Sequence, residues 1–78
     1  MASFRKRLGV EIARIRKDKD WSQRILERRA GVSLPTIQNL EYGLTRTSLI
    51  NVCKICRGLE INVVELLGDV GTQDAADD

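Results

Sequence analysis

The sequence predicts an all-α protein, a compact five-helix bundle, and three observations support this fold class. Five segments place apolar residues three or four positions apart, which is the spacing of one helix face. No segment shows the apolar and polar alternation that is typical of a strand. Serine, asparagine and glycine stand at the segment ends, where helix caps occur. A chain of 78 residues is long enough for a single core.

The first predicted helix runs from about Ser3 to Lys17 and the second from about Gln23 to Arg29. Four apolar residues of the first form a stripe that we expect to be buried: Phe4, Leu8, Ile12 and Ile15. Ser22 precedes the second helix, where its hydroxyl can accept a hydrogen bond from a free backbone N–H. Residues 30–33 predict a tight turn, because Gly31 adopts a left-handed backbone at little cost.

The third predicted helix is capped by Ser33 and ends at Gly43. Pro35 lies in its first turn, where a missing N–H does no harm. The fourth starts near residue 47 or 48 and buries apolar residues as far as Leu59. Asn62 and Glu65 match a capping pattern that opens a short fifth helix through residue 67.

Charge divides the chain into two parts. All 13 Lys and Arg lie at or before Arg57, and four of the 11 acidic residues lie in the last ten positions. Residues 1–68 therefore carry 13 basic and seven acidic side chains, a net charge of +6. We expect a domain over residues 1–68 and a disordered acidic tail over residues 69–78. The basic domain suits a polyanionic partner, although a solvated basic surface kept for solubility has the same composition.

Composition also argues against several classes of protein. The chain has no histidine, no nucleotide-binding loop and no paired carboxylates in a plausible cleft, so we expect no enzyme activity, no cofactor and no small-molecule ligand. No apolar run approaches the roughly 20 residues that cross a bilayer. The basic residues near the N-terminus are not followed by an apolar stretch, so we do not expect them to form a signal peptide. We expect a cytoplasmic protein with no membrane partner.

The two cysteines, Cys53 and Cys56, are three positions apart. A redox pair would be expected at the start of a helix that follows a strand, and here the pair falls inside a predicted helix. As a zinc half-site the pair lacks a second cysteine pair, and the chain has no histidine. We interpret both as ordinary core or near-core thiols, and we expect no metal site.

Residues 21–43 predict two short helices joined by a glycine-containing turn, the helix-turn-helix layout. Leu26 and Val32 would fix the angle between the helices, while Ile37 and Leu40 would bury the back of the second. A generic helical hairpin would satisfy the same geometry.

The residues of this segment resemble the phage-repressor and Cro type of helix-turn-helix, the XRE family. The matching residues within the motif are Ser22-Gln23, Leu26, Ala30-Gly31-Val32-Ser33, Thr36-Ile37, Leu40-Glu41 and Gly43. Outside it they are Leu8-Gly9, Ile12, Arg16, Ser48-Leu49, Val52, Ile55, Leu59, Ile61, Glu65 and Leu66-Leu67. The resemblance covers about residues 4–67 and implies a lambda-repressor-like DNA-binding fold, similar to restriction–modification controller proteins and small phage repressors.

Three residues depart from the family pattern. Glu27 stands where the family almost always has alanine, packed between the two motif helices. A carboxylate there must find a partner or bend outward, because an unpaired buried charge is very costly. Ile25 replaces a usual polar residue, and Thr47 replaces a common proline.

The resemblance implies that the second motif helix, about residues 33–41, enters the major groove. The residues expected to contact bases are Leu34, Pro35, Gln38 and Asn39, with Ser33 and Thr36 close by. Asn and Gln can pair with adenine N6 and N7, whereas Leu34 and Pro35 would pack on thymine methyl groups. The alternatives are helix-start packing for Leu34 and Pro35 and a solvated side chain for Asn39.

Backbone phosphates should be bound by residues at the start of the second helix and after the third. The expected residues are Gln23, Tyr42, Thr45 and Arg46, with Arg24 either on a phosphate or solvated. Arg16 and Glu41 match a family pair that joins the first helix to the end of the third. A bidentate pair would orient that helix, and two independent surface charges are the alternative.

The sequence therefore favours a transcriptional regulator that binds double-stranded DNA as a homodimer. By resemblance, the last two helices would form the dimer interface with Ile61, Val63, Val64, Leu66 and Leu67, some of which a monomer's core would also use. The alternative is an antitoxin-like module that binds a partner protein and autoregulates, a role in which the acidic tail could take part.

Overall fold

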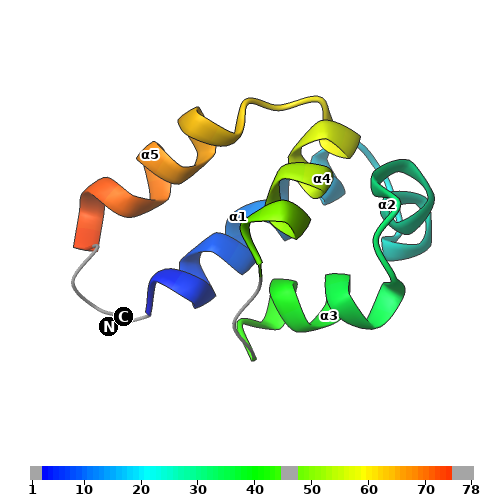
Figure 1. The fold of residues 1–78 in the computed structure, drawn as a ribbon, viewed down its shortest axis with the longest axis horizontal. Helices are drawn as coiled ribbons and strands as arrows, with labels where there is room; N and C mark the ends of the chain where they lie inside the picture. Colours follow the sequence, from blue (N-terminus) through cyan, green and yellow to red (C-terminus); the bar gives the residue numbers. More distant parts are fainter. Residues whose placement is uncertain (1–2, 45–47, 75–78) are drawn as a thin grey trace.

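Five helices and no strand make up residues 3–44 and 48–74, the part of the chain that the computed structural model describes. Their bounds are α1 Phe4–Asp18, α2 Gln23–Ala30, α3 Leu34–Tyr42, α4 Leu49–Leu59 and α5 Val63–Asp74. The helices α1 and α3 pack together, as do α2 and α4, and α5 packs on α1 and α4. In Figure 1, α3 runs along one edge of the molecule and α5 along the opposite edge. The all-α five-helix prediction is confirmed.

The core draws apolar side chains from every helix and from the turn after α2. Its buried residues are Leu8, Ile12, Leu26, Ala30, Val32, Ile37, Leu40, Val52, Ile55, Cys56, Leu59, Leu66 and Val70. Ile12, Leu26 and Ile37 are fully buried. Because these three come from α1, α2 and α3, the first three helices are held against one another by a common apolar centre.

Polar side chains and glycines set the helix ends. The hydroxyls of Ser3, Ser22 and Ser48 each accept a hydrogen bond from the backbone N–H three residues on, which satisfies one donor that the helix leaves free. The Asn62 Oδ1 accepts from the backbone N–H groups of residues 64 and 65, at 2.8 and 3.2 Å. Gly31 ends α2 with a φ of 68°, a left-handed conformation that side chains other than glycine adopt reluctantly.

The fifth helix is longer than predicted. It continues to Asp74, whereas the sequence predicted a disordered tail from residue 69. Val70 is buried in the core, and Gly71 lies beside the ring of Phe4 at the start of α1. This contact between residues far apart in the chain supplies apolar burial that the Asp-rich and Ala-containing composition of residues 69–78 did not suggest. The helix thus extends into the segment that the sequence assigned to the tail; residues 75–78 lie outside the described part.

None of the described helices is long and apolar enough to cross a bilayer.

Candidate nucleic-acid interface

The α2–turn–α3 unit presents one face of α3 outward. Ile37 and Leu40 lie on the buried side and pack into the core. Gln38 and Asn39 are half-buried, and Pro35 is exposed. Neither amide side chain has a hydrogen-bond partner among residues 3–44 and 48–74, so both retain donors and an acceptor for an external group. The back of α3 is thus fixed while its front carries free polar groups.

The first turn of α3 differs from the expected capping. The Ser33 side chain makes no bond to a backbone N–H; its hydroxyl instead lies 2.8 Å from that of Thr36. The Leu34 backbone N–H donates to the Glu27 Oε2 at 3.0 Å. Glu27, the departure from the family pattern, has therefore found a partner, and that partner is the start of α3. The signal in the sequence was a carboxylate at a position where the family almost always has alanine, which had to find a partner or bend outward.

Arg16 and Glu41 form a bidentate ion pair. The Arg16 Nε and Nη2 donate to the two carboxylate oxygens of Glu41 at 2.7 and 2.9 Å, and both side chains are buried. The hydrogen bond to Glu41 raises the pKa of Arg16 above its ordinary value. The third guanidinium nitrogen donates to the Trp21 carbonyl oxygen at 2.7 Å. Each buried charge is therefore paired, as burial requires.

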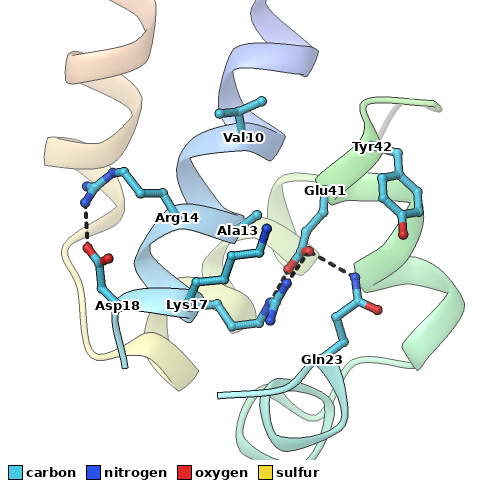
Figure 2. Close-up of a pocket in the computed structure, with 9 residues that line it drawn as sticks. Val10, Ala13, Arg14, Lys17, Asp18, Gln23, Glu41 and Tyr42 are labelled. Carbon is cyan, nitrogen blue, oxygen red and sulfur yellow. Dashed lines mark hydrogen bonds and ion pairs between the residues drawn. The ribbon is translucent and has the colours of Figure 1, made fainter. Parts of the chain in front are cut away.

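Gln23 joins this network, which the sequence did not predict. Its Nε2 donates to the Glu41 Oε1 at 3.0 Å, so one carboxylate connects α1, α2 and α3 (Figure 2). The second N–H of this amide and the free backbone N–H groups at the start of α2 remain available to an anion. Tyr42 lies nearby at the end of α3, and its side chain is exposed (Figure 2).

An open pocket with a volume of about 580 Å³ lies between the second half of α1 and the residues Gln23, Glu41 and Tyr42. Its lining includes Val10, Lys17, Gln23 and Tyr42 (Figure 2). It brings the cation Lys17 close to two of the predicted phosphate-binding residues. Of the other expected phosphate contacts, Arg24 is exposed and donates to the Glu27 Oε1 at 3.2 Å. Thr45 and Arg46 lie outside the described residues, as does Thr47.

The residues expected at a dimer interface divide into two groups. Leu66 is buried in the core of the single chain, and Ile61, Val63 and Leu67 pack against that core. Val64 points outward with 74% of its surface exposed. Of the five residues expected at the interface, Val64 is thus the one that does not pack against the core of the chain.

The two cysteines lie in different environments on α4. Cys53 is exposed and Cys56 is buried, and both are free thiols. Burial raises the pKa of the Cys56 thiol to about 11, with a smaller contribution from Cys53. Among the described residues, no three His, Cys, Asp or Glu side chains are placed to hold a metal ion.

Two short helices joined by a glycine turn, with the second helix fixed from behind and open in front, define a helix-turn-helix protein. The helix-turn-helix family model matches residues 12–66. The chain therefore belongs to this XRE-type helix-turn-helix family of transcriptional regulators. It is 32% identical over 64 residues to the uncharacterised HTH-type transcriptional regulator y4dJ of Sinorhizobium fredii, a match that covers 82% of this chain and 83% of that protein.

Two solved structures share the fold. The clp gene regulator ClgR from C. glutamicum superposes with a TM-score of 0.80 at 25% identity, over 92% of this chain and 94% of that one. The restriction-modification controller protein C.AhdI from Aeromonas hydrophila superposes with a TM-score of 0.74 at 28% identity, over 78% of this chain and 92% of that one. Both similarities extend beyond the two motif helices to most of the bundle.

Proposed function

We propose that this chain is a sequence-specific DNA-binding regulator that inserts α3 into the major groove and acts as a homodimer in the cytoplasm. One observation carries the proposal. The back of α3 is locked to the core and to the Arg16–Glu41 pair, while the amides of Gln38 and Asn39 have no partner in the described part of the chain. An amide in that setting can make paired hydrogen bonds to an adenine edge.

The same geometry supports the division of roles among residues. Leu34, Pro35, Gln38 and Asn39 would meet base edges, with Ser33 and Thr36 beside them. Gln23 and Tyr42 would bind phosphates at the ends of α2 and α3, together with Thr45 and Arg46. Arg24 would reach a phosphate only by sharing its guanidinium with Glu27, or by leaving it. Phosphate contacts set register and affinity, and base contacts set sequence preference.

Selection of binding sites from random duplex DNA tests the proposal directly. The wild-type protein should enrich one sequence, and Asn39→Ala should cost about 1–3 kcal/mol on that site and relax preference at one base position. Asn51→Ala, the matched amide deletion on α4, should leave the base preference unchanged. Arg46→Ala should weaken binding to all sequences alike and lower the salt slope by about one.

The dimer makes a separate prediction in the same experiment. A two-fold dimer should select two half-sites separated by about 10 bp, centre to centre, or a multiple of that spacing. A single half-site would overturn the dimer and leave DNA reading intact. Folded wild-type protein without affinity for any duplex at low salt would overturn the proposed function as a whole.

A further inference from the structure

Glu27 connects α2 to the start of α3. Its Oε2 accepts from the Leu34 backbone N–H at 3.0 Å, across a turn in which Gly31 takes a left-handed conformation. Its Oε1 accepts from the Arg24 Nη1 at 3.2 Å, and the Glu27 side chain is 29% exposed. The carboxylate thus spans the two motif helices and keeps both oxygens occupied.

The bond to Leu34 replaces the usual helix cap. The Ser33 hydroxyl is occupied by Thr36 and gives no bond to the backbone, and Pro35 has no N–H to be satisfied. In this turn, the backbone N–H of Leu34 is therefore satisfied by a side chain from outside α3, that of Glu27. A carboxylate at this end of a helix is also favoured by the helix dipole.

The capped turn is the one that should meet DNA. In the proposed function, Leu34 and Pro35 contact base edges, and their backbone is the part of α3 that Glu27 holds. The other fixed point of α3 is Glu41 near its end, which Arg16 and Gln23 hold. A helix fixed at both ends keeps one orientation, and misplacement by about 1 Å is enough to disturb both the packing proposed for Leu34 and Pro35 and the hydrogen bonds proposed for Gln38 and Asn39.

We infer that Glu27 is a positioning residue for base discrimination: it holds the first turn of α3 through the Leu34 N–H and so sets how α3 presents Leu34 and Pro35 to DNA. This inference rests on the proposed function. The negative charge of Glu27 has a separate effect on DNA affinity. A carboxylate near the DNA-facing end of α3 lowers the local positive potential and so weakens binding, and the charge of Arg24 offsets part of this effect. Glu27 therefore increases the preference for one DNA sequence and lowers the affinity for DNA in general.

Three variants separate the bond from the charge. Glu27→Ala removes both; alanine is the residue that the family resemblance leads us to expect here, so this variant should fold. Glu27→Gln removes the charge and keeps an oxygen that can accept from Leu34. Glu11→Gln is the matched control, because Glu11 on α1 also pairs with an arginine three positions away in the chain. Figure 2 shows that arginine, Arg14, on the side of α1 away from Tyr42.

The first readout is hydrogen exchange of the Leu34 amide in the free protein, with circular dichroism to verify folding. Loss of a capping bond worth about 1 kcal/mol should speed this exchange about fivefold in Glu27→Ala relative to the amides of α4. Glu27→Gln and Glu11→Gln should keep the wild-type rate. Unchanged Leu34 exchange in Glu27→Ala would overturn the inference without reference to DNA.

The second readout is base preference in the selection experiment. Glu27→Ala should reduce discrimination at the base pairs that face the first turn about fivefold, the equivalent of the lost capping bond. Glu27→Gln should keep the wild-type preference and bind all sequences more tightly, with Glu11→Gln showing a smaller gain. If the wild type and Glu27→Ala select the same site with equal discrimination, the inference is overturned and the proposed function is not. A wild-type protein that binds no duplex would overturn the proposed function instead.

Discussion

At the scale of single residues, the charged pair at the junction of three helices is the strongest constraint on α3. Arg16 and Glu41 are among the buried residues of a core that is otherwise apolar. Burial of either ion alone would be very costly, and the pair is tolerated because the carboxylate and the guanidinium satisfy each other, with Gln23 and the Trp21 carbonyl completing the set. The pair therefore specifies where the end of α3 must lie.

Removal of one partner should cost much more than removal of both. We expect Arg16→Ala and Glu41→Ala each to lower the free energy of unfolding by about 3–5 kcal/mol, since each leaves an uncompensated buried charge. The double variant should cost less than the sum of the two. Urea denaturation measures the free energy of unfolding of the two single variants and the double variant. The exposed pair of Arg14 and Asp18, on one helix, serves as control and should show much weaker coupling, because solvent screens both charges. Additive losses at Arg16 and Glu41 would mean that the pair contributes no coupling.

Cys56 makes stability depend on pH in the alkaline range. Its pKa rises from an ordinary value of 9.0 to about 11, because the buried thiol disfavours the charged form. A group whose pKa is raised in the folded state contributes stability that is complete below the unfolded pKa and is lost as pH rises through the folded one. We expect the free energy of unfolding to fall between about pH 9 and pH 11.

Cys56→Ala should flatten this pH dependence, although it lowers stability at every pH by removing a core side chain. Cys53→Ala should keep most of the wild-type slope, because Cys53 is exposed and only adds to the shift of its neighbour. Urea midpoints measured across the pH range provide the comparison. Equal slopes for the wild type and Cys56→Ala would assign the alkaline loss to other groups.

At the scale of helices, the approach of α1 to α3 depends on one glycine. A Cβ added at Gly9 would lie 2.2 Å from the Leu40 carbonyl oxygen and 2.6 Å from that of Glu41, both backbone atoms of α3. Backbone atoms cannot move aside as a flexible side chain can, so α3 as a whole would have to shift. Gly9 therefore sets the distance between the helix that carries Arg16 and the helix that carries Glu41.

Gly9→Ala should consequently destabilise the fold by about 1–3 kcal/mol or more, despite the better helix propensity of alanine. The matched substitution is Gly68→Ala in α5, where nothing lies within 4 Å of the added Cβ. That variant should gain about 0.5–1 kcal/mol from helix propensity. Thermal or urea unfolding of the two proteins tests the contrast. A neutral Gly9→Ala would show that α1 and α3 can separate without cost.

At the scale of the whole molecule, charge is unevenly distributed along the chain, and the exposed Val64 lies on a different helix from the predicted DNA contacts. The net charge of +6 belongs to residues 1–68, and the acidic excess lies beyond them. Val64 lies on α5, which runs along the opposite edge of the molecule from α3 (Figure 1). A partner protomer bound at α5 would therefore leave both copies of α3 open to DNA, as the proposed homodimer requires.

Val64→Glu should weaken self-association without unfolding the protomer. The side chain is 74% exposed, and an acidic residue in the first turn of α5 suits the helix dipole. Val10→Glu is the matched control, because Val10 is 65% exposed on α1, away from the proposed interface. Sedimentation equilibrium without DNA should show monomer for Val64→Glu and the wild-type association for Val10→Glu. An unchanged association in Val64→Glu would place the interface elsewhere.

The sequence alone determined the five helices, the turn at Gly31 and most of the core. These features follow from local causes, namely the spacing of apolar residues, the capping side chains and the backbone preference of glycine. The family resemblance added the residues that should contact DNA, and it pointed to the pairing of Arg16 with Glu41. Local pattern could not go further, because a periodicity records which face is buried and not what lies against it.

Only the tertiary structure decided the partners. The helix end at Asp74 depends on Val70 meeting the core and on Phe4 lying beside Gly71, a contact between residues far apart in the chain. Glu27 acts as a cap because the fold brings its carboxylate within 3.0 Å of the Leu34 N–H. Gln23 is tied to Glu41 for the same kind of reason. Hydrogen bonds are made over about 3 Å, and only the folded chain fixes which groups come that close.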